Sequence, residues 1–421
     1  MKIKRIIVTG ALANIFEWYD YSLFGSLAYL IGEKFFAAQD LRSNILNAFM
    51  IFAVGYIMRP LGGAFFGMLG DRLGRKFSLV ASVMFMSVPT ALVGLMPTYN
   101  QIGIYSTIAL VFIRMLQGLS MGGLLTGSIA FLVEHSPKNR KGLIASITAT
   151  SICVGILLGN FICFLITLLI GESEFHAWGW RVPFLLGGLN IFVGFYIIYK
   201  TEETPEYKVS KENIPANSIS YVFANHLSDM LVSIFINAPG SVMFYFQVVF
   251  VINFLKLGRI LEDGSIYAME SISLVAMGIF ALIAGYASDI FERRKLMQIC
   301  AIISFIASFP IIYGIESGNI IMIYTCQILL AILVGIYLGI EPALQAEFYP
   351  AKIRYTALSI SYNTSTSIFG GATPLIISYL YDATNSLYVF SLYLFVLILP
   401  NVISLGYYKP VPTNKKSKIV K

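Results

Sequence analysis

Hydrophobic residues occur along this chain in long runs that short polar segments separate. Each run has about 20 residues or more, which is the length that an α-helix needs to cross ~30 Å of hydrocarbon. The first run contains Glu17 and Asp20 and no small-residue cleavage site follows it, so we interpret it as a membrane helix and not as a secretory signal. The pattern predicts twelve membrane spans. They are residues 6–31, 45–69, 77–96, 102–133, 143–170, 182–199, 221–254, 266–288, 296–315, 319–346, 356–380 and 386–407.

Basic residues are distributed unequally between the two sets of connecting segments. Of the 29 Lys and Arg residues, 22 fall in the segments that lie on the same side as the N-terminus, and five fall on the other side. Because cytoplasmic loops of membrane proteins are enriched in Lys and Arg, both termini are predicted to be cytoplasmic. The net charge of +7 therefore reports topology, and we expect no nucleic-acid partner.

The composition agrees with this interpretation and excludes other classes. The chain is 57% hydrophobic and only 12% charged, whereas soluble domains carry about 25% charged residues. A soluble enzyme and a disordered chain are both inconsistent with these values. The four Cys residues lie in apolar runs without metal-ligand spacing, and no nucleophile–base arrangement is present, so we expect no metal, no cofactor and no enzymatic activity.

The chain contains an internal repeat. A polar segment at 200–220 separates a first half, 1–199, from a second half, 221–421. Two features recur, at offsets of 218 and 213 residues. They are Gly67-x3-Asp71-x3-Arg75 with Gly285-x3-Asp289-x3-Arg293, and Glu134-His-Ser-Pro137 with Glu347-Phe-Tyr-Pro350. The repeat predicts an all-α membrane protein of two pseudo-symmetric six-helix bundles joined by a cytoplasmic linker, with a short basic tail after the last span.

Two carboxylates lie halfway along the first predicted helix. Glu17 and Asp20 are three residues apart, so they belong to neighbouring parts of one helix face. A charge at this depth costs at least ~2.5 kcal/mol and needs an internal partner or an aqueous cavity. We favour a proton-binding or substrate-binding role; the alternative is a structural ion pair, for example with Arg59 in the second helix.

The fourth predicted helix carries Arg114 and Gln117 next to the small-residue motif Gly118-x3-Gly122, which permits close helix contact. We expect both polar side chains to face the bundle interior. Three roles for Arg114 remain open: binding a substrate carboxylate, organising the proton site at Glu17 and Asp20, or forming a structural pair. Aromatic residues of the first and seventh helices could also bind a quaternary ammonium group if they line a cavity.

The segment 67–76 (GMLGDRLGRK) is a short turn with closely spaced glycines and charges. Gly67, Gly74 and Asp71 indicate a contact with the end of a neighbouring helix, which would act as a cytoplasmic latch that breaks when the cavity opens inward. Asp289 and Arg293 repeat this latch in the second half.

Several motifs resemble one known family, the metabolite:proton symporters of the major facilitator superfamily, which includes bacterial proline/glycine betaine, α-ketoglutarate, citrate and shikimate permeases. The resemblance covers almost the whole chain. It rests on Asn14-x2-Glu17-Trp-Tyr-Asp20, Arg59-Pro-Leu-Gly-Gly63 with Gly70-Asp-Arg72-x-Gly-Arg-Lys76, Gln117-Gly118, Trp178-Gly-Trp-Arg-Val-Pro183, Glu203-Thr-Pro205 and Glu347-Phe-Tyr-Pro350-x3-Arg354 followed by Tyr362-Asn363.

The resemblance implies proton-coupled uptake by alternating access, with Asp71, Arg72 and Arg75 in the gating loop. One position departs from the family pattern: Leu124 follows Gly123, where the family usually has Glu. This departure would be consistent with an altered coupling route, an altered substrate or a carrier that is not driven by protons.

We therefore expect a monomeric carrier in a bacterial cytoplasmic membrane that imports a small polar metabolite with a proton. Compatible solutes such as proline or glycine betaine are the first expected substrates. Carboxylates such as α-ketoglutarate, citrate or shikimate are the alternative, although the predicted spans contain only two cations, Arg59 and Arg114. A further alternative is a transporter-derived receptor that moves no substrate.

Overall fold

The computed structural model describes residues 3–37, 41–258 and 260–407, and every regular element in these ranges is a helix. The helices of the first half are α1 (Ile3–Ser26), α2 (Ala28–Phe35), α3 (Leu41–Arg72), α4 (Arg75–Leu95), α5 (Tyr99–Ile102), α6 (Ile104–His135), α7 (Lys141–Ala145), α8 (Ile147–Ile170), α9 (Glu172–Glu174), the π-helix η1 (Phe175–Gly179), α10 (Arg181–Gly187) and α11 (Asn190–Lys200).

The segment between the halves forms α12 (Pro205–Ser210) and the 3-10 helix η2 (Lys211–Asn213). The helices that follow are α13 (Ser218–Asn225), α14 (Leu227–Tyr245), the π-helix η3 (Phe246–Val251), α15 (Ile252–Leu257), α16 (Asp263–Ile290), α17 (Arg293–Glu316), α18 (Ile320–Phe348), α19 (Arg354–Ser365), the π-helix η4 (Thr366–Gly370), α20 (Thr373–Thr384) and α21 (Val389–Tyr407).

Helices occupy each of the twelve predicted spans. Within the described residues, nine helices are long and apolar enough to cross a membrane by length and composition alone. The other three spans correspond to α1, α3 and the pair α19 and α20. α1 carries four charged side chains, and α19 is only 12 residues long because the π-helix η4 follows it before α20 begins. All three spans bury polar side chains inside the protein, for example Glu17, Arg59 and Asn363.

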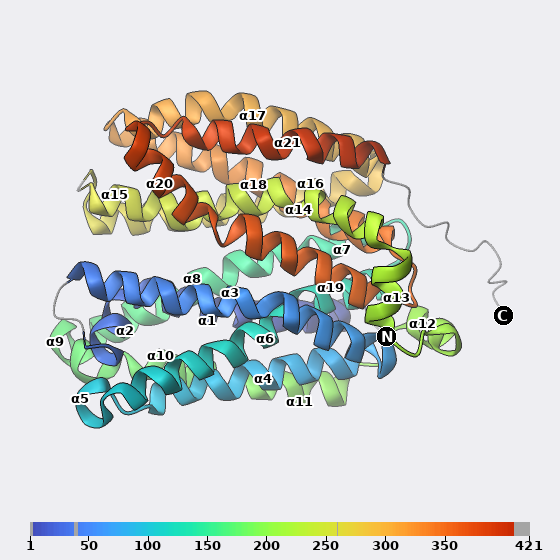
Figure 1. The fold of residues 1–421 in the computed structure, drawn as a ribbon, viewed down its shortest axis with the longest axis horizontal. Coiled ribbons are helices and arrows are strands. Elements are labelled where there is room, and N and C mark those ends of the chain that lie inside the picture. Colours follow the sequence, from blue (N-terminus) through green and yellow to red (C-terminus); the bar gives the residue numbers. More distant parts are fainter. Residues whose placement is uncertain (1–2, 38–40, 259, 408–421) are drawn as a thin grey trace.

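The two halves lie side by side with their long helices roughly parallel (Figure 1). Within the first half, α3 packs along α6 and α1 along α8; within the second, α16 packs along α18 and α14 along α21. Contacts between the halves are made chiefly by α3 with α19 and by α8 with α16. The molecule is thus two helical bundles that meet along one interface, as the internal repeat predicts.

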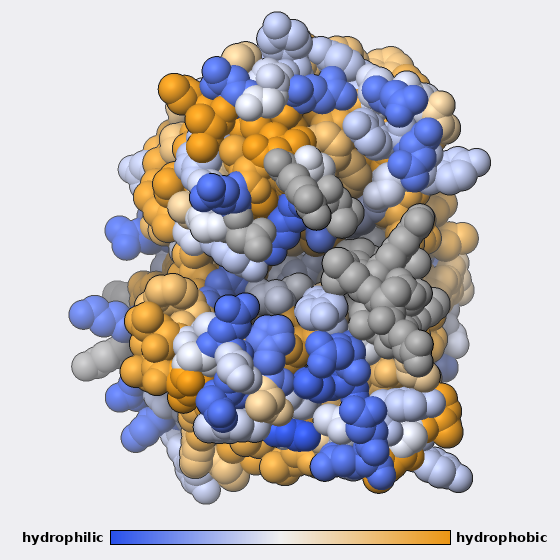
Figure 2. Space-filling model, turned by 90° about the vertical axis from the view of Figure 1, so that its left-hand side faces the viewer, coloured by the Kyte–Doolittle hydropathy of each residue, from blue (hydrophilic) through white to orange (hydrophobic). Residues whose placement is uncertain are grey.

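The outer surface of both bundles is apolar where it would face lipid. Large hydrophobic side chains such as Phe112, Leu169 and Leu392 are 60%, 72% and 65% exposed. Figure 2 views the end of the molecule away from the chain termini: polar residues gather on this end of both bundles, and hydrophobic residues flank them. This distribution matches a protein whose sides contact hydrocarbon and whose ends contact water.

Candidate functional site

The first functional region lies where α3 ends, on the terminal face, which we define as the end of the bundle where α1 begins and α21 ends (Figure 1). The Asp71 carboxylate accepts hydrogen bonds from the backbone N–H groups of Tyr355 (3.3 Å) and Thr356 (3.0 Å). Both groups belong to the first turn of α19. Because a helix N-terminus carries unpaired N–H groups and partial positive charge, a residue of the first half here caps a helix of the second.

Buried charges surround this contact. Arg75 pairs with Asp71 at 3.0 Å and with Glu134 at 3.2 Å, and Arg354 of the second half reaches Glu134 at 3.0 Å. Arg75 and Glu134 have fully buried side chains, and the Arg354 side chain is only 8% exposed. We call Asp71, Arg75, Glu134 and Arg354 the first gate cluster. It ties the two halves together on the terminal face.

The second half contains an equivalent contact. Asp289, at the end of α16, accepts hydrogen bonds from the backbone N–H groups of Gly142 (2.7 Å) and Leu143 (2.9 Å), in the first turn of α7. Arg293 pairs with Asp289 at 2.7 Å and with Glu347 at 2.5 Å. We call Asp289, Arg293 and Glu347 the second gate cluster. Each half therefore caps a helix of the other with an aspartate.

The remaining residues of the predicted gating loop have different surroundings. A Cβ atom at Gly67 would lie 2.7 Å from the Thr356 Cα atom, so glycine allows α3 to approach α19 closely. Gly74 has a φ angle of 111°, which other L-residues rarely adopt. The Arg72 side chain is exposed and its carbonyl accepts a hydrogen bond from Tyr207 Oη at 2.8 Å, so its guanidinium lies outside the first gate cluster.

The segment between the halves packs against the first gate cluster, a role that its polar composition did not predict. Glu206 pairs with Arg354 at 2.5 Å, and Thr204 Oγ1 donates a hydrogen bond to Glu134 at 2.5 Å. The Glu203 carboxylate accepts a hydrogen bond from the backbone N–H of Arg75 at 3.0 Å. The Glu203-Thr-Pro205 motif was the sequence signal for this contact.

A second functional region lies inside the first half, between α1, α4 and α6. The Asp20 carboxylate accepts hydrogen bonds from Thr90 Oγ1 (2.7 Å) and Gln117 Nε2 (2.9 Å), and it pairs with Arg114 at 3.5 Å. Arg114 also donates to Gln117 Oε1 at 3.0 Å and lies 3.5 Å from the centre of the Phe24 ring. We call Asp20, Thr90, Arg114 and Gln117 the Asp20–Arg114 cluster; Thr90 is the member that the sequence did not single out.

Glu17, unlike Asp20, forms no ion pair within the described residues. Glu17 is fully buried, and neither carboxylate oxygen accepts a hydrogen bond from a described residue. Arg59 is 1% exposed; its Nε donates to Asn363 Oδ1 of the second half at 3.1 Å, while Nη1 and Nη2 have no hydrogen bond within the described chain. No ion pair joins Glu17 or Asp20 to Arg59 in the described residues, so the structural pair with Arg59 weighed above is absent.

A narrow cavity lies between the halves next to Arg59. It is lined by Trp18, Arg59 and Ile152 of the first half and by Ser241, Phe244, Tyr245, Leu338, Tyr362 and Thr366 of the second. A hydrogen bond of 2.5 Å joins the Tyr56 and Tyr245 hydroxyls across the interface, and the Trp18 and Phe244 rings meet edge to face. Aromatic residues of the first and seventh predicted helices thus do line a cavity.

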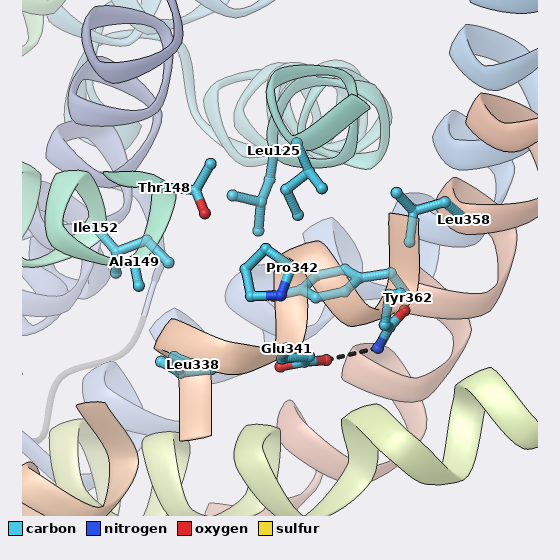
Figure 3. A pocket seen from close by; sticks show the side chains of 11 residues that line it. Leu125, Thr148, Ala149, Ile152, Leu338, Glu341, Pro342, Leu358 and Tyr362 are labelled. Carbon is cyan, nitrogen blue, oxygen red and sulfur yellow. Dashed lines mark hydrogen bonds between the residues drawn. The ribbon is translucent and has the colours of Figure 1, made fainter. Parts of the chain in front are cut away.

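An adjoining cavity contains a carboxylate that sequence reasoning missed. Glu341 lies in the last third of α18, is 2% exposed, and lines a space with Leu125, Thr148, Pro342 and Tyr362 (Figure 3). Asn237 Nδ2 and Gln345 Nε2 each donate a hydrogen bond of 2.6 Å to its Oε1 atom. The rule that selected Glu17, a carboxylate inside an apolar span, would also have selected Glu341.

Leu124, the position that departs from the family pattern, is fully buried in an apolar cluster with Ala13, Leu79 and Phe131. A leucine at this position binds no proton. Any proton-binding group of this protein therefore lies elsewhere. Glu17, Asp20, Glu270 and Glu341 are buried carboxylates of the described membrane helices, and of these Glu341 lines a cavity.

Two family models match the chain. The model described as "Sugar (and other) transporter" matches residues 6–230, and the model described as "Major Facilitator Superfamily" matches residues 240–420. Similar curated proteins include the glycine betaine/proline/ectoine/pipecolic acid transporter OusA of Dickeya dadantii, at 30% identity over 99% of this chain and 85% of the relative. The proline/betaine transporter of Escherichia coli K12 is 29% identical over 96% of this chain and 83% of the relative. The shikimate transporter of the same strain is 30% identical over 89% of this chain and 87% of the relative.

Solved structures agree on the fold. The proton:xylose symporter XylE bound to 6-bromo-6-deoxy-D-glucose superposes with a TM-score of 0.78 over 96% of this chain and 94% of that chain, at 19% identity. The inward-open structure of the xylose transporter XylE from E. coli has a TM-score of 0.64 at 19% identity, covering 98% of both chains.

Proposed function

Because the chain belongs to the major facilitator superfamily, in the metabolite:proton symporter family, and is a membrane transporter and not an enzyme, we propose that it imports a compatible solute such as proline or glycine betaine together with a proton. The full-length similarity to transporters named for proline and betaine supports the substrate class. The relatives also support a multi-pass protein of the bacterial inner membrane.

The observation that carries the proposal is the Asp20–Arg114 cluster. A buried carboxylate beside a guanidinium can take up a proton, and the neutral acid then no longer attracts the cation. Protonation of Asp20 would leave the positive charge of Arg114 uncompensated and so favour a substrate carboxylate bound between the halves, and loss of the proton would restore the ion pair. Proton binding and substrate binding are coupled in this way without a carboxylate at position 124.

We place both termini in the cytoplasm, because the terminal face carries the excess of Lys and Arg. The two gate clusters then lie on the cytoplasmic side, and the described conformation is closed there by contacts between the halves. Inward opening has to break these contacts, which is the action expected of a latch in alternating access.

A carboxylate permease is the second candidate, and the similarity to the shikimate transporter favours it. A dicarboxylate or tricarboxylate would need several cations in the cavity. In the described residues, Arg59 is the cation that lines the cavity, and Arg114 is already paired with Asp20. A transporter-derived receptor that moves no substrate is less compatible with two well-formed gate clusters, which a protein that does not cycle would not need.

Uptake by proteoliposomes tests the proposal. Labelled proline, glycine betaine, α-ketoglutarate, citrate and shikimate are offered with and without an inward proton gradient, and protein-free liposomes are the control. Accumulation of proline or betaine that collapses when the gradient is dissipated would support the proposal. Accumulation of a carboxylate alone would establish the second candidate, and gradient-independent equilibration would contradict symport.

A further inference from the structure

We propose that Glu341 binds the positively charged nitrogen of a zwitterionic substrate whose carboxylate is bound by Arg59. The inference rests on the proposed function, because it assigns the two ends of a compatible solute to two sides of one site. Glu341 belongs to the second half and Arg59 to the first, and both side chains are buried at the interface (2% and 1% exposed).

The surroundings of Glu341 hold its carboxylate in one orientation. Asn237 and Gln345 direct their amide N–H groups at Oε1. The amide oxygens are engaged in turn, because Ser241 Oγ donates to Asn237 Oδ1 at 2.7 Å and Ser233 Oγ donates to Gln345 Oε1 at 2.9 Å. All polar partners of Glu341 are therefore neutral, and its Oε2 atom accepts no hydrogen bond from the described residues.

A buried carboxylate without a cation is costly in a membrane. Within the described chain, no Lys, Arg or His forms an ion pair with Glu341. Arg59 is a buried cation whose Nη1 and Nη2 atoms donate no hydrogen bond to a described residue, so both atoms can bind an acceptor. Two groups of opposite charge on the two sides of an interface, neither of which forms an ion pair with a described residue, are suited to a ligand that carries both charges.

The two groups face a shared space. Arg59 lines one cavity and Glu341 the adjoining one, and Ile152, Leu338 and Tyr362 line both. Trp18, Phe244 and Tyr245 complete the wall on the Arg59 side. On the Glu341 side, the Tyr362 ring lines the same cavity as the carboxylate, and a ring face and a carboxylate both attract an ammonium group.

The charges in the interior also fit this assignment. Arg59 and Arg114 contribute two positive charges, and Glu17, Asp20 and Glu341 can contribute three negative ones; Glu270 of α16 lines neither cavity and is left out of this balance. A zwitterion adds no net charge, so one proton restores neutrality when substrate is bound. An anionic substrate would add negative charge, so more than one proton would be needed to make the interior neutral.

The test compares glycine betaine with tert-butylacetate, which has the same carboxylate and a neutral carbon in place of the nitrogen. Competition against labelled betaine is measured on the purified full-length protein without a gradient. We expect wild type to prefer betaine, and Glu341→Gln to weaken betaine binding about 10-fold or more, because the trimethylammonium group has no N–H and is held by its attraction to the carboxylate charge. Affinity for tert-butylacetate should stay unchanged.

Two variants serve as controls. Glu270→Gln neutralises another buried carboxylate of the membrane region that lies outside both cavities. Ser128→Ala alters the position that corresponds to Glu341 in the first half by the 213-residue offset. Both should retain the preference of wild type for betaine.

Equal affinity of wild type for betaine and tert-butylacetate would overturn the inference even if Glu341→Gln failed to fold. An unchanged preference for betaine over tert-butylacetate in folded Glu341→Gln would also overturn it. If Glu341→Gln lost only the gradient-driven accumulation of betaine, Glu341 would be assigned to proton binding instead. A wild-type protein that binds shikimate or citrate but neither betaine nor proline would contradict the proposed function itself, which is a separate outcome.

Discussion

The two halves of the molecule share a fold and a gating motif, but they differ in the charges they place in the interior. The 213-residue offset that aligns Glu134 with Glu347 places Gln327 opposite Arg114 and Ser128 opposite Glu341. α6 therefore carries a guanidinium where α18 carries an amide, and α18 carries a carboxylate where α6 carries a hydroxyl. All four side chains are buried.

The gate clusters, in contrast, are repeated closely. In both, an aspartate caps a helix of the other half, an arginine four residues later pairs with it, and a glutamate binds that arginine. Opening and closing require the same mechanical action from each half, which favours equivalent residues. A small asymmetric ligand has different groups at its two ends, so the residues that bind it have to differ.

The largest expected effect concerns Arg114. Arg114→Ala should reduce uptake to background while the protein still inserts, because Asp20 loses its cation and the interior loses a positive charge that favours the substrate carboxylate. Gln327→Ala, at the corresponding position of the second half, should retain most of the uptake. Membrane yield and proteoliposome uptake of both variants are the measurements, and normal transport by Arg114→Ala would remove its assigned role.

Glu17→Gln should affect proton coupling more than binding. Glu17 has no hydrogen bond from a described residue, so its neutral analogue leaves the packing intact. We expect gradient-driven accumulation to be lost while betaine binding remains within about three-fold of wild type, which corresponds to less than ~1 kcal/mol. This phenotype is the opposite of that expected for Glu341→Gln, and an unchanged dependence on the gradient would leave proton coupling to the Asp20–Arg114 cluster without Glu17.

The gate clusters should differ in stability because their burial differs. Glu134 is fully buried and binds two arginines, whereas Glu347 is 23% exposed and binds one. Removing one partner of a buried pair costs about 3–5 kcal/mol, so Glu134→Gln should lower the thermal unfolding temperature clearly. Glu347→Gln should cost about 1 kcal/mol or less, as partly exposed pairs do. Equal decreases in the unfolding temperature of the two variants would mean that both gate clusters stabilise the closed terminal face to the same extent.

Uptake by the aspartate variants sharpens the same comparison. Asp71→Asn should reduce uptake about 10-fold, because it removes both a buried ion pair and the charge that faces the N-terminus of α19. Asp289→Asn should have a weaker effect, since Arg293 keeps Glu347 and is 15% exposed. Initial rates measured at matched protein density test this order, and a larger loss in Asp289→Asn would reverse it.

The smallest effect is expected for Arg72. Its side chain is exposed on the terminal face, and surface substitutions usually change stability by less than about 0.5 kcal/mol. Arg72→Ala should therefore keep uptake within about two-fold of wild type. A strong loss would show that Arg72 acts in the open conformation and would restore the gating role that the family resemblance implies.

Much of the candidate site could be predicted because charges inside apolar spans are conspicuous. Glu17, Asp20, Arg59 and Arg114 were found in this way, and Glu341 satisfies the same rule. What the spacing did not reveal was their pairing. Glu17 and Asp20 share one helix face by spacing, yet Asp20 pairs with Arg114 whereas the Glu17 carboxylate accepts no hydrogen bond from a described residue, because each meets different neighbours around α1.

The sequence by itself determined the membrane-spanning segments, the division into two halves and the repeated gate motif, since hydrophobic length, charge distribution and repeat offsets can all be measured along the chain. Only the tertiary structure decided that Asp71 caps α19, that Thr204 and Glu206 reach the first gate cluster, and that Glu341 and Arg59 flank adjoining cavities. Each of these contacts joins residues more than 60 positions apart, and their proximity depends on how helices pack rather than on any pattern along one of them.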